Sequence, residues 1–114
     1  MATSNRYVAF PKRAMNSNGT ETASQSLTVS TAAVSPTGYT GSSAVDNNSV
    51  VVFDVQTSNV RVRWDGTSPT STVGHLLYVG SAYTWDVDQF NAAKFIRDTA
   101  ATADAVIFSS PFQI

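Results

Sequence analysis

The feature that most constrains the fold of this chain is an alternation of apolar and polar residues that recurs along most of its 114 residues. It is clearest at residues 59–64, NVRVRW, where two valines and Trp64 alternate with Arg61 and Arg63. A period of two places successive side chains on opposite faces of a β-strand. The segment therefore predicts a half-buried strand with Trp64 in the core and both arginines outside. Helical periodicity extends nowhere beyond about one turn, so we expect an all-β fold.

The same alternation between turn signals predicts further short strands. They are expected at residues 26–33, 50–56, 76–79, 83–87, 95–96 and 105–108. In the third of these, either Leu76 and Tyr78 or Leu77 and Val79 carry the apolar face. A single helical turn capped by Asp88 is expected after residue 87. Seven or so short strands of this spacing are typical of an antiparallel β-sandwich, and we expect a jelly-roll-like one.

The length fits one domain. We divide the chain into residues 1–25, an extended N-terminal arm with a flexible connection, and residues 26–114, the β-sandwich body. The arm begins with a short apolar patch flanked by basic residues and continues into a polar, turn-forming stretch at residues 16–20. Such a stretch has no periodicity of its own to support a strand or helix.

The composition excludes several classes of function. Hydrophobic residues make up 42 % of the chain and charged residues only 13 %, so the surface is polar but weakly charged and suits packing against a partner. The net charge of −1 does not favour nucleic-acid binding. No apolar run approaches the roughly 20 residues of a membrane span. The first residues lack the apolar core of a signal peptide, so we expect no membrane association and maturation in the cytoplasm.

Candidate chemistry is sparse. His75 is the single histidine, the chain has no cysteine, and no nucleophile-elbow sequence accompanies the histidine. The aspartates show no calcium-loop spacing, and there is no phosphate-binding glycine loop. A pair of glycosidase carboxylates is not excluded by spacing, but so small a domain would hardly enclose both acids and a sugar. We therefore predict that the protein is not an enzyme and binds no metal or cofactor.

Two groups of residues admit two interpretations each. Trp64 and Trp85 lie on the apolar phase of their strands, which favours core packing. The alternative is a sugar-stacking platform that also includes Tyr39, Phe53, Tyr78 and Tyr83. Arg61 and Arg63 are expected to be solvated, facing Asp54 or Asp86 across strands. The sharper alternative for these two arginines is a contact with carboxylates of a partner.

Residues 60–70, VRVRWDGTSPT, followed by VGHLL at 73–77, resemble a pattern of small bacteriophage structural proteins. Residues 95–97 and 101–105 are also similar to the later strands of such proteins, and the likeness spans residues 50–110. The turn itself has a local explanation, because Asp65 can accept hydrogen bonds from its own backbone, Gly66 can take positive φ and Pro69 stiffens the exit. We accordingly expect loop architecture here, with Gly74 reversing the chain. The same turn also occurs in β-sandwich modules attached to carbohydrate-active enzymes.

The resemblance implies a virion protein, assembled in the host cytoplasm, that binds the outer capsid surface as a decoration or cement protein. Its expected partners are the major capsid protein or another virion protein. A homodimer or homotrimer is also expected, since small sandwiches leave sheet edges that must be covered. The alternatives are a head–tail, neck or tail accessory component, or a carbohydrate-binding module.

We expect the arm to dock on a neighbouring subunit or on the capsid, burying its aromatic side chains and pairing its cations with carboxylates. The competing interpretation is a frayed terminus or a strand added to the chain's own sheet. The candidate interface residues are Arg6, Tyr7, Val8, Phe10, Lys12 and Arg13 in the arm, with Arg61 and Arg63 in the body.

Overall fold

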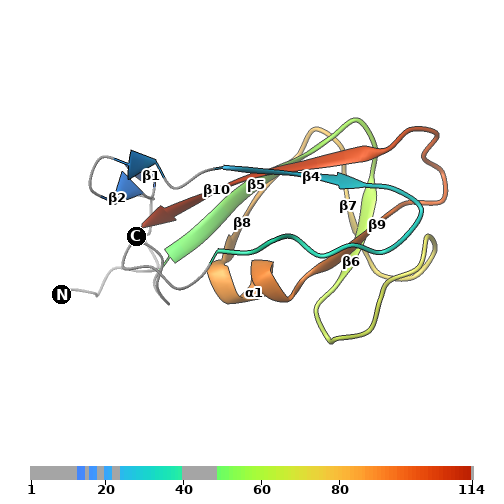
Figure 1. The fold of residues 1–114 in the computed structure, drawn as a ribbon. Coiled ribbons are helices and arrows are strands. Elements are labelled where there is room, and N and C mark those ends of the chain that lie inside the picture. The colour runs from blue at the N-terminus through green and yellow to red at the C-terminus, as the bar shows by residue number, and fades with distance from the viewer. Residues whose placement is uncertain (1–12, 15, 18–19, 22–23, 40–48, 114) are drawn as a thin grey trace.

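Antiparallel strands dominate the chain, as the arrows of Figure 1 show, and the all-β prediction is confirmed. This computed structural model describes residues 13–14, 16–17, 20–21, 24–39 and 49–113. The elements are β1 (Arg13–Ala14), β2 (Asn16–Ser17), β3 (Thr20–Glu21), β4 (Gln25–Val29), β5 (Ser49–Gln56), β6 (Val60–Arg63), β7 (His75–Leu77), β8 (Ala82–Asp86), α1 (Val87–Ala92), β9 (Lys94–Arg97) and β10 (Ala105–Gln113).

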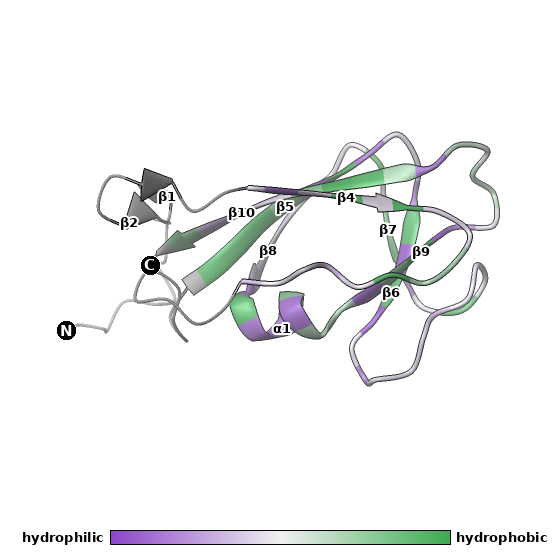
Figure 2. Ribbon diagram, in the orientation of Figure 1, coloured by the Kyte–Doolittle hydropathy of each residue, from purple (hydrophilic) through white to green (hydrophobic). Residues whose placement is uncertain are grey.

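The larger sheet has five strands and is organised around β10. One edge of β10 pairs with β5 from Val106 to Gln113, and β5 in turn pairs with β8. The other edge pairs with β4 at its beginning and with β1 at its end. In Figure 2 the green, hydrophobic stretches of β5 and β10 lie beside one another, as expected of strands buried on at least one face.

Pro111 lies at the point where the partner of β10 changes from β4 to β1. Gln25 is opposite Ser109, whereas Ala14 is opposite Phe112. Val55 is bonded to Gly80 and Ser81, which lead into β8 on the far side of β5 from β10. The alternation of antiparallel pairs therefore turns the odd-numbered residues of β10 toward β4 and β1. Proline has no N–H to donate. The gap between β4 and β1 therefore lies beside Pro111, the one residue of β10 that has no backbone N–H to pair.

The smaller sheet has the order β7–β6–β9, and β2 pairs with β3 as a separate two-stranded sheet. The outer edge of β9 is occupied by the segment that follows β4. Val34 and Phe95 exchange two backbone hydrogen bonds of 2.8 Å, and the Arg97 N–H donates to Ser30 O at 2.9 Å. This segment thus connects the two larger sheets along one side of the molecule (Figure 1).

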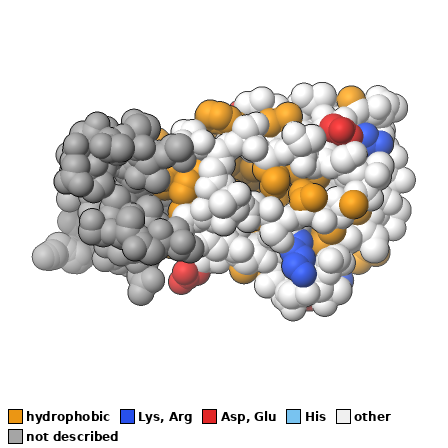
Figure 3. All heavy atoms as spheres, viewed as in Figure 1, with side chains coloured by type: hydrophobic (Ala, Val, Ile, Leu, Met, Phe, Trp, Pro, Cys, Tyr) orange, Lys and Arg blue, Asp and Glu red, His pale blue; other side chains and the backbone are white. Residues whose placement is uncertain are grey.

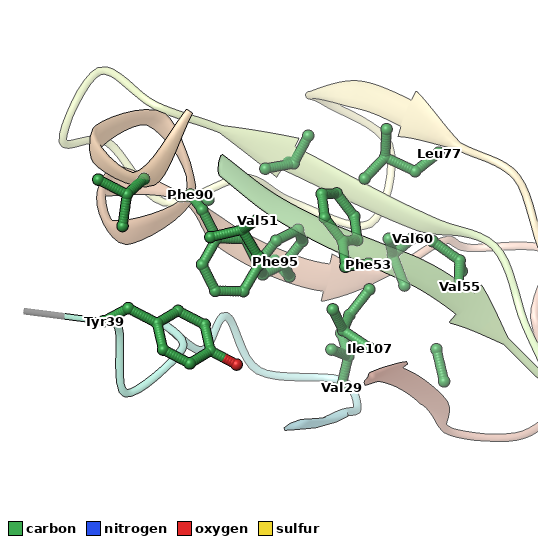
Figure 4. Close-up of a cluster of buried hydrophobic side chains, with 14 residues drawn as sticks. Val29, Tyr39, Val51, Phe53, Val55, Val60, Leu77, Phe90, Phe95 and Ile107 are labelled. Carbon is green, nitrogen blue, oxygen red and sulfur yellow. The ribbon is translucent and has the colours of Figure 1, made fainter. Parts of the chain in front are cut away.

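A single hydrophobic core collects side chains from both larger sheets and from α1 (Figure 4). Phe53 is 1 % exposed, and its ring lies 4.6 Å from Trp85, 5.5 Å from Phe90 and 6.2 Å from Phe95, measured between centroids. Burying one such side chain is worth about 1.5–3 kcal/mol. The core members are Val29, Tyr39, Val51, Phe53, Val55, Val60, Val62, Leu77, Val87, Phe90, Ala93, Phe95, Ala105 and Ile107.

Several boundaries differ from the sequence prediction. The strand expected at 26–33 ends at Val29, because the chain then bends toward β9. The strand expected at 105–108 continues to Gln113, because β5 pairs with it throughout. At residues 76–79 Leu77 is buried but Tyr78 and Val79 are exposed, so neither predicted pairing holds, since β7 ends at Leu77.

The helical turn is present, but the predicted cap, Asp88, is wrong. Asp86 is the N-cap, and its Oδ1 accepts the Gln89 N–H at 2.7 Å. The helix begins two residues earlier than expected because Val87 and Phe90 both turn into the core. Asp88 instead lies in the first helical turn, where a negative charge is favourable.

Candidate functional site

The arm residues Arg6, Tyr7, Val8, Phe10 and Lys12 lie outside the described part of the chain. Arg13 falls within it, and its backbone pairs with Gln113 in β1 and β10. The docking role expected for these six residues therefore stays a prediction.

Arg61 forms an ion pair that the sequence prediction missed. Its Nε donates to Asp98 Oδ1 at 2.7 Å, and its NH1 donates to Gly74 O at 3.1 Å. Burial by itself raises the pKa of Asp98, but the bond from Arg61 and the Ala100 N–H outweigh it and leave this pKa below its ordinary value. The pair fastens the loop before β7 to the turn after β9, which is an architectural role.

Arg63 pairs with Asp65 two residues along the chain. Its Nε donates to Asp65 Oδ1 at 3.2 Å, and its NH2 donates to the other carboxylate oxygen. Asp65 Oδ1 also accepts the Thr67 N–H at 3.1 Å. The bonds from Arg63 and then Thr67 lower the pKa of Asp65. This geometry, with φ of +84° at Gly66 and +143° at Gly74, confirms the predicted turn chemistry.

The expectation that these arginines face Asp54 or Asp86 is wrong. Asp54 accepts a hydrogen bond from Gln56 Nε2 at 3.0 Å, and Asp86 caps the helix. Both aspartates belong to the larger sheet, whereas the arginines belong to β6 of the smaller one. The error lies in the strand pairing, which period-two patterning does not determine.

A surface depression of about 560 Å³ lies at the end of β6. It is lined by Arg63, Trp64, Asp65, Val73, Gly74 and His75. The imidazole of His75 is 5.0 Å from the Trp64 ring, measured between centroids, and the Trp64 Nε1–H is buried with no hydrogen-bond partner among the described residues. The one carboxylate in the lining is already engaged by Arg63. These residues do not supply the nucleophile, base and orienting acid of a hydrolytic site.

The tryptophans pack on the core, as predicted. Trp64 and Trp85 are partly buried against it and meet edge to face at 5.0 Å. The alternative platform of six aromatic side chains is not formed. Phe53 and Tyr39 are buried at 1 % and 4 % exposure, while Tyr78 is 56 % exposed. A sugar-stacking surface needs its rings on one exposed face, and these rings do not share one.

The outer face of the larger sheet is the surface that the sequence analysis overlooked. Its centre is Phe108, which is 44 % exposed and lies opposite Asp54 on one side and Ser26 on the other. Helix α1 packs on the opposite, core-facing side through Phe90. By register the outer face consists of Ser26, Thr28, Val50, Val52, Asp54, Gln56, Ala82, Thr84, Asp86, Val106, Phe108, Ser110 and Phe112.

This outer face has no basic residue and only two acidic ones, Asp54 and Asp86, among the described positions. Its other side chains are serines, threonines, valines and phenylalanines, with one glutamine, Gln56, and one alanine, Ala82. Figure 3, in the orientation of Figure 1, also shows few Lys, Arg, Asp and Glu side chains among the described atoms of the surface turned to the viewer, which is not this outer face. The run AVIF at 105–108, apolar in both phases, is the signal that could have predicted an outward-facing Phe108.

Within the ranges that the structure describes, no three His, Asp or Glu side chains are grouped so that they could hold a metal ion. Over the same ranges no helix has the length and apolarity needed to cross a membrane. No family model, no curated protein and no solved structure matches this chain. The site is therefore interpreted from its own geometry.

Proposed function

We propose that this protein is a non-enzymatic virion component that binds the outer surface of a bacteriophage capsid and stabilises it as a decoration or cement protein. The observation that carries the proposal is the outer face of the larger sheet. It is broad, weakly charged and centred on an exposed phenylalanine, Phe108. Flat surfaces with an apolar centre and a polar rim are typical of protein–protein interfaces.

Two further features support a structural role. The aromatic core around Phe53 is closely packed, and the charged side chains near the surface depression are tied to one another or to backbone. The similarity of residues 60–77 and 95–105 to small phage structural proteins points to the virion as the place where the chain acts. On an icosahedral shell, weak contacts repeated many times give strong overall attachment.

The proposal includes a finer description of the fold. Residues of both larger sheets, such as Val55 and Ile107 in one and Val60 and Phe95 in the other, belong to the same core. This supports two sheets packed face to face as a β-sandwich. The jelly-roll-like strand order stays a prediction.

The test is attachment to purified capsids. Phe108→Asp places a charge at the centre of the proposed contact, and we expect it to lower capsid occupancy several-fold. Val79→Asp is the matched control, because Val79 is 47 % exposed but lies in the loop after β7 and is not one of the residues of this face. Equal occupancy for the two variants would contradict the role of the outer face.

The number of copies in purified virions separates this proposal from its alternatives. A decoration protein is present in proportion to the major capsid protein, whereas a head–tail, neck or tail accessory component is present in few copies per particle. A copy number set by the portal or the tail would overturn the capsid assignment. Binding to glycans that Phe108→Asp leaves unchanged would instead support a carbohydrate-binding module.

A further inference from the structure

Strand β8 is an open edge of the larger sheet. Within the described residues it pairs with β5 alone. The connection that leads into it ends in a bulge, where the Gly80 N–H donates to Val55 O at 2.8 Å and the Val55 N–H donates to Ser81 O at 3.2 Å. Gly80 has the positive φ of +86° that this type of bulge requires.

The bulge determines which backbone groups of β8 are free. Hydrogen-bonded and non-hydrogen-bonded pairs alternate along an antiparallel ladder. Since Val55 is bonded to Ser81, the next bonded pairs are Phe53 with Tyr83 and Val51 with Trp85. The N–H and C=O groups of Ala82 and Thr84 and the N–H of Asp86 therefore point away from β5, whereas the Asp86 C=O, at the helix N-cap, accepts the first hydrogen bond of α1.

Among the described strands, the opposite edge of the larger sheet is shared by β1 and by β4, a strand of five residues that pairs with β10 alone. The β9 edge of the smaller sheet is bonded to Val34 and Ser30. Strand β8 differs from β4 in carrying two large aromatic side chains, Tyr83 and Trp85. Strand β8 contains no lysine, arginine or proline, which often protect an exposed edge, and its one charged residue is Asp86 at its end. Its outward side chains Ala82 and Thr84 are exposed and uncharged.

The side chains on the core-facing side of β8 are incompletely buried. Tyr83 and Trp85 lie on the inner face, at 5.4 Å and 4.6 Å from the Phe53 ring, yet both are only partly buried. Large aromatic side chains on an edge strand gain burial when another strand is added beside them.

We propose that β8 pairs antiparallel with β8 of a second copy, about a two-fold axis at Thr84. This register places Thr84 opposite Thr84 of the partner subunit, where the two residues exchange two backbone hydrogen bonds, and each Asp86 N–H meets the C=O of the partner's Ala82. Tyr83 then faces the partner's Trp85, an aromatic cross-strand pair on the inner side. Asp86 faces the partner's Ala82, so the two carboxylates lie roughly 13 Å apart along the strand and do not repel strongly.

The pairing joins two five-stranded sheets into one continuous sheet across the dimer. A single five-residue strand on each side makes a small interface, so the association is concentration-dependent in solution. High local concentration on a lattice would strengthen it. The inference does not rest on the proposed virion role, and its test needs only the purified protein.

The first experiment uses the absence of cysteine from the chain. Thr84→Cys introduces one thiol, and in the proposed dimer two such positions form a hydrogen-bonded pair with Cα atoms about 5.5 Å apart, within disulfide range. We expect mild oxidation to give several-fold more covalent dimer than for Thr28→Cys, the matched control. Thr28 is equally an exposed threonine on a strand, but it lies in β4. Equal cross-linking of the two variants would overturn the proposal.

The second experiment measures mass by sedimentation over a range of concentrations. The wild type is expected to rise from 12.1 kDa toward twice that mass. Thr84→Pro removes an N–H that points outward, a position where an edge strand tolerates proline. We expect it to melt like the wild type and to stay monomeric. The proposal would be refuted by a wild type that is monomeric at every concentration, or by a Thr84→Pro variant that dimerises normally. If the Thr84→Pro variant fails to fold, the cross-linking comparison decides.

Discussion

Asn91 holds the backbone of Tyr39 on both sides. The Tyr39 N–H donates to Asn91 Oδ1 at 2.9 Å, and Asn91 Nδ2 donates to Tyr39 O at 2.8 Å. The Tyr39 hydroxyl reaches the other way and donates to Ser109 O at 3.0 Å. One tyrosine thus fastens the segment after β4 to both α1 and β10, and burial raises the pKa of its hydroxyl.

Replacing Asn91 with alanine removes both bonds and leaves the Tyr39 backbone groups without partners. We expect Asn91→Ala to lower the free energy of unfolding by about 2 kcal/mol, measured by urea titration. Gln89→Ala, on the same helix, is the control, because the described contact of Gln89 is its backbone N–H with Asp86. A loss of stability no greater than that of the control would show that the two Asn91–Tyr39 hydrogen bonds do not stabilise the fold.

The Arg61–Asp98 pair predicts a pH dependence of stability. The pKa of Asp98 is lowered in the folded state, so its contribution is present above the unfolded pKa of about 3.9 and is lost as the pH falls through the folded value. Asp98→Asn should therefore cost about 2 kcal/mol at pH 7, and this difference from the wild type should shrink below about pH 4. Urea unfolding at several pH values measures it.

Asp104→Asn is the comparison for that experiment. Asp104 also pairs with an arginine, Arg97, at 2.8 Å, but its side chain is 48 % exposed. Exposed pairs contribute little, so we expect a smaller loss at pH 7. If the two variants lose equal stability, burial does not explain the contribution of the Arg61–Asp98 pair to the free energy of unfolding.

The helix cap gives a test that distinguishes two neighbouring aspartates. Asp86→Ala removes the acceptor of the Gln89 N–H and should cost about 1 kcal/mol. Asp88→Ala, within the first turn, should cost only a few tenths. Thermal melts of both variants provide the measurement, and the reverse order would restore Asp88 as the cap.

Two glycines in one loop should respond differently to alanine. A Cβ at Gly74 would lie 3.2 Å from Arg61 Cβ, Pro69 Cβ and Val62 O, whereas a Cβ at Gly66 would meet nothing within 4 Å. Both have positive φ, so both substitutions cost about 1 kcal/mol from the backbone. Gly74→Ala should cost clearly more, and equal melting temperatures would contradict this close packing.

The sequence predicted local structure well where the alternation was strict. At β5 and β6 the buried sets Val51, Phe53, Val55 and Val60, Val62 were identified because one face of each strand is apolar. The end of β4 was misplaced, because the chain leaves the ladder there to bond with β9, and Thr31 and Ala33 continue the alternation regardless. Local periodicity carries no information on where a neighbouring strand stops.

Contacts between distant residues were the part that could not be predicted. Arg61 and Asp98 are separated by 37 positions, and several other aspartates would have satisfied the same charge. The cap could not be assigned either, since Asp86 and Asp88 are both good N-cap residues and only the burial of Val87 decides between them. For the candidate site, the turn at Asp65 was predicted because its bonds are local, whereas the outer face around Phe108 depends on strand order.

The position of β10 has a consequence for how the protein is made. This strand lies in the middle of the larger sheet, between β4 and β5, although it is the last of the described elements to be synthesised. The ladders that β4 and β5 form with β10 therefore cannot assemble until residues 105–113 have left the ribosome. Such late, long-range pairing slows folding, and we expect nascent chains that stop before Ala105 to depend on chaperones.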